Sequence, residues 1–374
     1  MGRPAKTIVI SGYYGFRNSG DEAVLQSILL ALQEESRKQE ITIEPVVLSV
    51  DPEWTTRMYG VKAVHRMKAG PLLAAIRQCD GLISGGGSLL QDATGKMSIP
   101  YYVGVIKIAQ WFRKPTFVYS QGIGPVNSTA FYPLIRSAFK HSAYVSVRDQ
   151  ESADLLKSMH LGQTRIEVVP DPVMGLPLKA SIRQQTASNQ EGRKPILGVS
   201  VRYWNEDRSE LAGLAAALDR IVADRDVDIR FLPFHLPSDE EASQEVVSRM
   251  GEAARALSTI VRDVTHPQDM LGEVSACDAI IGMRLHSLIY AASQQVPMIG
   301  ISYDPKIDQF LHRLNMRSAA TTARFDSTAV AAETLRQLDE RRHWQLEKGD
   351  AIERLKAEAN KPAQQVVSFL RQKG

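Results

Sequence analysis

Short apolar runs that alternate with longer amphipathic stretches are the feature that most constrains the fold of this chain of 374 residues. The runs have the length of buried strands, and the stretches between them have the length of helices. Alternation of this kind predicts parallel sheets that are covered by helices on both faces. The predicted strands are Thr7–Ser11, Pro45–Val50, Leu82–Ser84, Thr116–Ser120, Val145–Val147, Val168–Val169, Ile196–Val201, Ile229–Leu232, Ala279–Gly282 and Pro297–Ile301, and the clearest helices are Glu22–Glu35, Gly70–Cys79 and Leu211–Ala223.

The predicted strands fall into two sets on either side of a polar stretch. This stretch, Ala180–Lys194, is rich in Gln, Ser and Asn and is the best candidate for an interdomain linker. The chain is also longer than a single hydrophobic core usually supports. We therefore expect an α/β protein with two Rossmann-like domains facing a cleft, at residues 1–180 and 195–325, with a linker at 181–194. The charged, helix-rich tail at 326–374 is expected to return to the first domain.

Composition is typical of a globular protein from a reducing compartment. Hydrophobic residues make up 44% of the chain, charged residues 23%, and the formal net charge is +3. Such a slight charge, without a Lys/Arg block, argues against a dedicated nucleic-acid binder. Cys79 and Cys277 each precede an aspartate and an apolar run, which favours half-buried core positions over a disulfide or a metal pair. No signal peptide or membrane-spanning run is recognisable, so we expect a cytoplasmic protein.

Two glycine-rich segments follow predicted strands of the first set. The segment Gly12–Ala23 is either a structural strand–helix loop or a loop that contacts an acceptor or a phosphate through Asn18, Asp21 or Glu22. The segment Ser84-Gly85-Gly86-Gly87-Ser88 is either a flexible turn or, as we favour, a nest of backbone N–H groups that binds an anion. Neither segment has the glycine spacing of the dinucleotide fingerprint or the lysine of a Walker A motif.

Basic residues follow several of the predicted strands, at the sheet edge where ligands bind in open α/β folds. Arg148, Arg202 and Lys306 each come shortly after such a strand. Arg284 and His286 lie between a buried strand and the start of a helix, where free N–H groups favour an anion. Arg offers a planar fork for carboxylate or phosphate, and His carries a proton near neutral pH. Any one of these residues could be a cap or a surface ion pair, but several together indicate a polyanionic substrate.

Taken together, these motifs resemble those of the polysaccharide pyruvyl transferase family. The resemblance covers most of the chain and is closest to the bacterial CsaB-type enzymes, which modify the secondary cell wall polymer that anchors S-layer proteins. It implies a GT-B-like fold, phosphoenolpyruvate as the donor, and a 4,6-ketal on N-acetylmannosamine of a lipid-diphosphate-linked saccharide as the product. The motifs are Asn18-Ser19-Gly20-Asp21-Glu22-Ala23, Ser84-Gly85-Gly86-Gly87-Ser88, Ser120-Gln121-Gly122-Ile123-Gly124-Pro125, Val147-Arg148-Asp149, Pro170-Asp171-Pro172 and Gly282-Met283-Arg284-Leu285-His286.

The resemblance also assigns site residues. It places the phosphoenolpyruvate contacts at Arg284, Leu285 and His286 and extends them to Arg148 and Arg202. We expect His286 to protonate the methylene carbon of the donor or, alternatively, only to hydrogen-bond its phosphate. The full expectation is a catalytic set of His286, Arg284 and Arg148, a donor-binding set of Arg202, Leu285, Gly85, Gly86, Gly87, Ser88 and Lys306, and an acceptor-binding set of Asn18, Asp21, Glu22 and Asp171.

Phosphoenolpyruvate is then a co-substrate, and we expect neither a cofactor nor a metal, because the sequence shows no cluster of His, Cys and Asp ligands. The second expected partner is a lipid-linked saccharide, and no nucleic acid is expected. A peripheral contact with the inner face of the membrane, through Arg341, Arg342 and Trp344 of the tail, is an alternative to the favoured interpretation as a solvated helix face.

Two other functional classes share this fold. A nucleotide-sugar-dependent GT-B glycosyltransferase would use the same arginines for a diphosphate, but no carboxylate pair for a ribose is recognisable. A non-catalytic glycan-binding protein is disfavoured by the presence of both Arg284 and His286.

Overall fold

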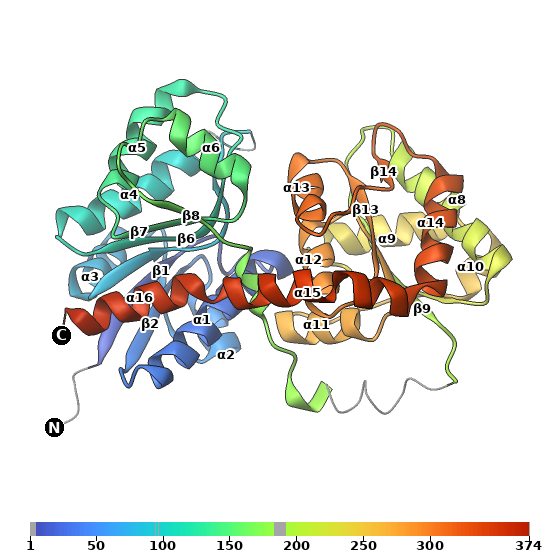
Figure 1. The fold of residues 1–374 in the computed structure, drawn as a ribbon, viewed down its shortest axis with the longest axis horizontal. Helices are drawn as coiled ribbons and strands as arrows, with labels where there is room; N and C mark the ends of the chain where they lie inside the picture. Colours follow the sequence, from blue (N-terminus) through green and yellow to red (C-terminus); the bar gives the residue numbers. More distant parts are fainter. Residues whose placement is uncertain (1–4, 94, 96, 183–191, 374) are drawn as a thin grey trace. The chain divides into compact units, whose positions relative to one another are not determined.

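Two α/β units make up the computed structural model, which describes residues 5–93, 95, 97–182 and 192–373. Unit 1 comprises Met1–Leu176 and Leu355–Gly374, and unit 2 comprises Pro177–Arg354. Most of the expected linker, residues 183–191, lies outside the described residues. Each unit has its own sheet with helices on both faces (Figure 1).

Unit 1 has a parallel sheet with the strand order β3-β2-β1-β4-β6-β7-β8, and β5 pairs with β6. A sheet that grows outward in both directions from β1 is the doubly wound arrangement expected when helices connect successive strands. Its strands are β1 (Lys6–Ser11), β2 (Ile43–Ser49), β3 (Lys62–His65), β4 (Gly81–Ser84), β5 (Gly87–Leu90), β6 (Thr116–Ile123), β7 (Tyr144–Val147) and β8 (Ile166–Val168). Its helices are α1 (Ser19–Lys38), α2 (Pro52–Tyr59), α3 (Ala69–Gln78), α4 (Ser98–Trp111), α5 (Tyr132–Lys140), α6 (Gln150–Ser158) and α16 (Lys361–Gln372), with short 3-10 turns η1 (Thr129–Phe131) and η2 (Pro172–Gly175).

Unit 2 repeats this plan with the parallel order β11-β10-β9-β12-β13-β14. Its strands are β9 (Ile196–Ser200), β10 (Asp228–Phe231), β11 (Ser258–Ile260), β12 (Ala279–Gly282), β13 (Met298–Ser302) and β14 (Ala320–Thr321). Its helices are α8 (Ser209–Asp224), α9 (Ser238–Arg249), α10 (Glu252–Ala256), α11 (Pro267–Ser275), α12 (Leu285–Ser293), α13 (Pro305–Arg313) and α14 (Ser327–Asp339).

The two units use the same side-chain contact to align their central strands. The Asp80 carboxylate accepts a hydrogen bond from Thr7 N at 2.8 Å, and the Asp278 carboxylate accepts one from Ile196 N at 2.8 Å. Each aspartate also donates its own N–H to the carbonyl of the same partner. The cysteine that precedes each aspartate is a free thiol, as the sequence predicted, and it is fully buried where the sequence predicted half-burial.

The C-terminal helices divide between the units. Helix α14 packs against α8, and its apolar side chains lie in the core of unit 2. Helix α15 (Arg341–Ala359) contains the boundary at Leu355, and α16 packs against α1 of unit 1. The return to unit 1 thus begins at Leu355 and does not include the whole tail from 326, which the sequence had predicted to return. The reason is that α8 already covers the apolar face of α14.

Tail residue Trp344 also differs from expectation. Its indole is buried within unit 2, so it cannot belong to a lipid-facing patch. Within the described part of the chain, no helix is both long enough and apolar enough to cross a membrane.

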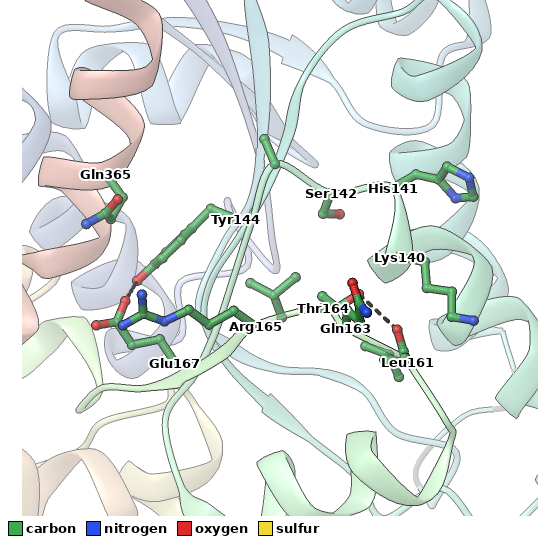
Figure 2. Close-up of a pocket in the computed structure, with 13 residues that line it drawn as sticks. Lys140, His141, Ser142, Tyr144, Leu161, Gln163, Thr164, Arg165, Glu167 and Gln365 are labelled. Carbon is green, nitrogen blue, oxygen red and sulfur yellow. Dashed lines mark hydrogen bonds between the residues drawn. The ribbon is translucent and has the colours of Figure 1, made fainter.

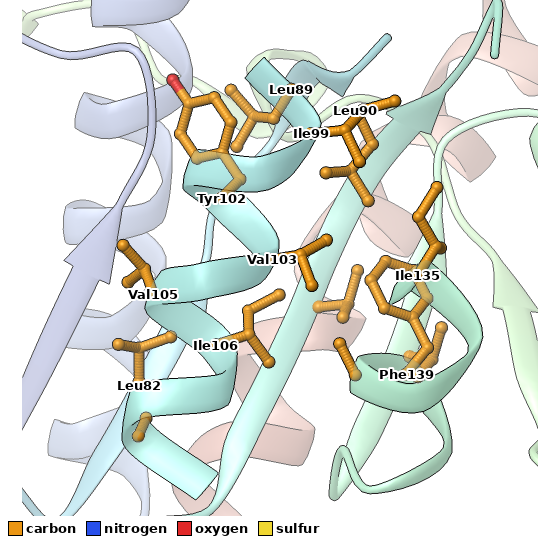
Figure 3. Close-up of a cluster of buried hydrophobic side chains, with 14 of the residues drawn as sticks. Leu82, Leu89, Leu90, Ile99, Tyr102, Val103, Val105, Ile106, Ile135 and Phe139 are labelled. Atoms are coloured by element: carbon orange, nitrogen blue, oxygen red, sulfur yellow. The ribbon is translucent and has the colours of Figure 1, made fainter. Parts of the chain in front are cut away.

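A cluster of apolar side chains fills the space between the unit 1 sheet and its helices (Figure 3). Val103 and Ile106 of α4 face Ile135 and Phe139 of α5. Tyr102 lies at the edge of this cluster, with its hydroxyl turned away from the labelled apolar side chains. The Tyr102 hydroxyl is therefore a polar atom of α4 that lies outside this apolar cluster.

Candidate functional site

Arg148 is buried directly after β7 and is surrounded by acceptors from its own unit. Its Nη2 donates to Ser88 Oγ at 2.8 Å, its Nη1 lies 3.4 Å from Asp171 Oδ2, and its Nε lies 3.5 Å from Asp149 Oδ2. The structure therefore brings together three predicted site residues, Arg148, Ser88 and Asp171. Because two carboxylates already contact the guanidinium, a donor anion at Arg148 would share it with them.

Packing explains each glycine of the triple-glycine segment. A Cβ at Gly85 would overlap the Tyr14 hydroxyl, and one at Gly86 would lie 2.9 Å from a side-chain carbon of α1. Gly87 has a φ of +91°, which side chains rarely adopt, and it belongs to β5. The N–H of Gly85 donates to Ser11 O at 2.7 Å. The segment is thus a close-packed contact and a strand start, not a flexible turn, and the Gly85 N–H is used within the sheet.

Asn18 and Asp21 lie at the start of α1. The Asn18 side chain is the N-cap of this helix and accepts from Gly20 N at 3.0 Å and from Asp21 N at 3.5 Å. Asp21 is half-buried, and its Oδ1 would lie 3.0 Å from a Cβ placed on Gly87. Asp21 is therefore adjacent to β5, whereas the Asn18 side chain is occupied in holding the helix end.

Glu22 is almost completely buried, with 1% of its surface exposed. Its carboxylate accepts hydrogen bonds from Gly15 N and from the Tyr59 hydroxyl, both at 2.8 Å. Burial raises the pKa of Glu22 from 4.5 to about 7, although these hydrogen bonds act in the opposite direction. The carboxylate holds the loop after β1 from within the protein.

Ser120 and Gln121, in the second half of β6, are further candidates that the expected site set omitted. Ser120 has a φ of +46° although it is not glycine. Ser120 Oγ and Gln121 Oε1 are buried, and neither has a hydrogen-bond partner among the described residues. Backbone strain together with buried polar atoms is characteristic of functional loops. The sequence signal was available, because both residues belong to a motif that carried the family resemblance.

In unit 2, Arg284 is held by Asp239, a residue that the sequence analysis did not select. Asp239 is fully buried in the first turn of α9, and it accepts from Phe234 N at 3.1 Å and His235 N at 3.0 Å. Its carboxylate also accepts from Arg284 Nε at 3.0 Å and from Arg284 Nη2. One edge of the guanidinium therefore faces Asp239, and only the remaining N–H groups can reach a ligand.

Arg202 follows β9 and lies between aromatic rings. Its Nη1 donates to the Tyr303 hydroxyl at 2.8 Å, and its guanidinium carbon is 4.9 Å from the Tyr303 ring centre and 5.3 Å from that of Trp204. These contacts orient the side chain but bring no negative charge. Arg202 makes no ion pair with any residue that the structure describes, which suits an arginine that binds an anionic ligand.

His235 shows that Arg202 and Arg284 act on one region of unit 2. Its pKa is lowered, mainly by burial and then by the positive charge of Arg284, with a further contribution from Arg202 and an opposing one from Asp239. Both guanidinium groups are therefore close enough to influence the same imidazole. Two guanidinium groups and one carboxylate, those of Arg202, Arg284 and Asp239, give this region a net positive charge.

The remaining predicted residues of unit 2 lie at the same edge. Arg284 is the N-cap residue of α12, and Leu285 and His286, both half-buried, form its first turn. Lys306 lies in the first turn of α13, where its Nζ is 3.5 Å from Asp304 Oδ2 and its N–H donates to Asp304 Oδ1 at 3.0 Å. The strand–helix junctions that the sequence predicted are thus the ones that carry these side chains.

Two cavities lie elsewhere in the units. One of about 820 Å³ opens near the amino ends of β7 and β8. Figure 2 shows the hydrogen bond from Tyr144 to Glu167 on one side of this cavity and Lys140 and His141 on another. The second, of about 540 Å³, is lined by residues 315–319 and by parts of α14 and α15. Neither cavity is lined by a predicted site residue. Across the described residues, no group of three or more His, Cys, Asp or Glu side chains could hold a metal ion.

Comparison with known proteins identifies both a family and a fold. A family model described as polysaccharide pyruvyl transferase matches residues 18–305. Among similar solved structures are the UDP-GlcNAc 2-epimerase of Methanocaldococcus jannaschii (TM-score 0.66, 11% identity, covering 99% of this chain and 100% of that one) and the UDP-GlcNAc 2-epimerase of Neisseria meningitidis bound to UDP-GlcNAc (0.63, 12%, 99% and 100%). A glycosyltransferase of Rickettsia africae is also similar (0.60, 11%, 99% and 97%). At these identities the likeness shows the fold alone, two parallel-sheet α/β domains of the GT-B type, as the sequence analysis expected.

Proposed function

The chain belongs to the polysaccharide pyruvyl transferase family, and we propose that it transfers the enolpyruvyl group of phosphoenolpyruvate to a saccharide. The proposed acceptor is a lipid-diphosphate-linked saccharide that contains N-acetylmannosamine, and the proposed product is its 4,6-ketal. As in the CsaB-type enzymes that the sequence resembles, this product would belong to the secondary cell wall polymer that anchors S-layer proteins.

The positively charged region of unit 2 is the observation that carries the proposal. Phosphoenolpyruvate bears a carboxylate and a phosphate, and each requires a cationic partner. Arg202 has aromatic neighbours and no ion-pair partner in the described chain. Arg284 is fixed by Asp239 through Nε and Nη2, and its remaining N–H groups do not contact this carboxylate. Two oriented arginines at the carboxyl edge of one sheet thus match the two anionic groups of the donor.

The proposed reaction gives a role to His286. Protonation of the C3 methylene by His286 makes C2 electrophilic, and the first sugar hydroxyl then adds at C2. The C2–O bond to phosphate breaks, and the second hydroxyl adds at the same carbon. The two sugar hydroxyls lose one proton each. One of these protons replaces the proton that was given to C3, and the other is taken up by the phosphate. The products are the ketal and inorganic phosphate. Arg284 would offset the negative charge of the departing phosphate.

The four residues expected to bind the acceptor differ in what they contact within the protein. Asp21 remains the proposed direct contact to the sugar, because it is half-buried beside β5. Asn18, Glu22 and Asp171 hold a helix end, the loop after β1 and Arg148 respectively. We propose that these three act by positioning the loops that meet the acceptor.

Phosphate release from phosphoenolpyruvate, measured with a panel of free and lipid-linked saccharides, tests the proposal. We expect release only with an acceptor present, and, in deuterated water, one deuterium in the ketal methyl group. Arg202→Ala should raise the KM for phosphoenolpyruvate, whereas Arg262→Ala, at an exposed arginine of the same unit, should not. Binding of a UDP-sugar without binding of phosphoenolpyruvate would instead identify a nucleotide-sugar-dependent glycosyltransferase.

A further inference from the structure

Arg66 is a buried arginine without a carboxylate partner. Two arginines are buried among the residues that the structure describes, Arg66 with 8% of its surface exposed and Arg148. Arg148 contacts Asp149 and Asp171, whereas Arg66 forms no ion pair within the described chain. A buried charge is costly unless an opposite charge accompanies it. The position of Arg66 is therefore one at which an anionic ligand would complete the charge balance.

The protein fixes this guanidinium through neutral groups. Nη1 donates to Gly12 O at 3.1 Å and Nη2 donates to the Tyr102 hydroxyl at 3.2 Å, the atom that projects beyond the core in Figure 3. The guanidinium carbon lies 4.4 Å from the ring centre of Tyr101 and 5.5 Å from that of Phe16. An arginine has five N–H donors, so these contacts orient the group without using all of its donors.

Arg66 lies at the same sheet edge as the proposed acceptor contact. It follows β3 directly, and Gly12, its hydrogen-bond partner, follows β1. The pKa of Tyr13 is raised by burial and by the nearby Asp21 carboxylate, and Arg66 acts in the opposite direction. Tyr13 is therefore close to both Arg66 and Asp21. Asp21 and Arg66 therefore act on the same side chain at this edge of the sheet.

Exposed apolar side chains lie on the segments that hold this buried cation. The Tyr13 ring is exposed and stacks on Phe16 with the ring centres 3.9 Å apart. Met67, next in sequence to Arg66, is 66% exposed. Met97 is 74% exposed and lies one helical turn before Tyr101, whose N–H donates to its carbonyl at 3.1 Å. A single cation bordered by exposed apolar side chains is complementary to an anionic group that carries an apolar chain.

We propose that Arg66 binds the phosphate of a lipid-linked acceptor and that Tyr13, Met67 and Met97 contact the apolar chain attached to it. This inference rests on the proposed function and deepens it, because it assigns the end of the acceptor that does not react. Arg66 acts here as an acceptor-binding residue and takes no part in the chemistry at C2.

Direct binding separates this inference from the proposed function, because it needs no turnover. The probes are farnesyl diphosphate, inorganic diphosphate and farnesol, titrated into the full chain by calorimetry. The wild type should bind farnesyl diphosphate more tightly than inorganic diphosphate. Arg66→Gln should weaken both by at least about tenfold, and the pair Met67→Ser with Met97→Ser should weaken only farnesyl diphosphate. Arg57→Gln, at an exposed arginine of α2, is the matched control and should match the wild type.

Further measurements distinguish a loss of ligand binding from a loss of folding. Phosphoenolpyruvate binding and thermal unfolding report whether Arg66→Gln is folded, and Arg66→Lys should recover part of the diphosphate affinity because it retains the charge. Saturating phosphoenolpyruvate should not displace the probe. Equal binding of farnesyl diphosphate by Arg66→Gln and wild type overturns the inference, whatever the enzyme assay shows. Tight binding of farnesol alone would reduce the surface to an apolar patch and would also contradict it.

Discussion

Three buried carboxylates, Glu22, Glu210 and Asp239, each accept backbone N–H hydrogen bonds from the loop that follows a strand. The loops after β1 and β9 carry the candidate site residues Asn18 and Arg202, and the loop after β10 carries His235. Fixing a loop through a buried acceptor limits its motion before a ligand arrives, which is the usual purpose of a supporting shell around a binding site. Asp239 goes further, because the same carboxylate also holds Arg284.

Replacement of Arg284 by lysine should be poorly tolerated. A lysine is a point charge, so it cannot both occupy the two Asp239 oxygens and present a planar edge to the donor. We expect Arg284→Lys to lose at least about tenfold in kcat/KM for phosphoenolpyruvate, which corresponds to about 1.4 kcal/mol. Steady-state phosphate release measures this. Arg249→Lys, at a surface ion pair of the same unit, provides the control. If both variants behave like the wild type, Arg284 has only a structural role.

The buried Glu22 carboxyl should give the protein a pH-dependent stability. Its pKa is about 7 in the folded chain and 4.5 when solvated, so only the folded chain holds this proton between those values. The contribution is therefore complete below about pH 4.5 and is lost as the pH rises to about 7. Glu22→Gln should remove a decline on the order of 1–3 kcal/mol across this window.

Urea unfolding of wild type and Glu22→Gln at several pH values between 4.5 and 7.5 would measure the difference. Glu34→Gln, at a more exposed glutamate of the same helix, should keep the wild-type slope. Parallel pH profiles for wild type and Glu22→Gln would show that the buried proton contributes nothing to stability.

Among strands and helices, the sequence revealed what is buried and missed what lies at an edge. Every predicted strand overlaps a strand of the structure, and all but one of them are internal strands, which are covered on both faces and are therefore rich in apolar residues. The exception is β8, an edge strand that the two valines Val168 and Val169 still marked. The unpredicted strands β3, β11 and β14 lie at sheet edges with mostly half-exposed side chains, so no apolar run marks them. The unpredicted β5 begins at a glycine of a segment that we had interpreted as a loop.

The stability of the packing between Gly85 and the loop after β1 should depend on one atom, the Tyr14 hydroxyl oxygen. Gly85 leaves room for the Tyr14 hydroxyl, so Gly85→Ala should destabilise the protein by roughly 1–3 kcal/mol through overpacking. Tyr14→Phe removes the oxygen that an alanine methyl would overlap, and the double variant should therefore recover most of this loss. Gly70→Ala, where nothing lies near the added methyl, is the control. Additive losses in a double-mutant cycle would refute the steric explanation.

Across the two units, the sequence predicted which strand ends carry basic residues better than it predicted the partners of those residues within the fold. Parallel strands place all their carboxyl ends at one edge, so a basic residue after each strand is predictable from local pattern alone. Asp239 lies 45 positions before Arg284, and no local pattern connects them. Arg66 was missed because the feature that distinguishes it is the absence of a carboxylate in the fold, which a sequence does not display.

Donor binding should need no added metal ion, because Arg202 and Arg284 supply positive charge at the carboxyl edge of unit 2. Calorimetric titration of the full chain with phosphoenolpyruvate should give the same affinity, within about twofold, in EDTA and in Mg²⁺. Affinity should fall as salt concentration rises, since screening weakens attraction between the dianion and partly exposed arginines. Arg202→Ala should reduce that salt dependence, because one of the interacting charges is gone. Binding that disappears in EDTA and returns with Mg²⁺ would instead mean that a metal ion carries part of the charge that we assign to these arginines.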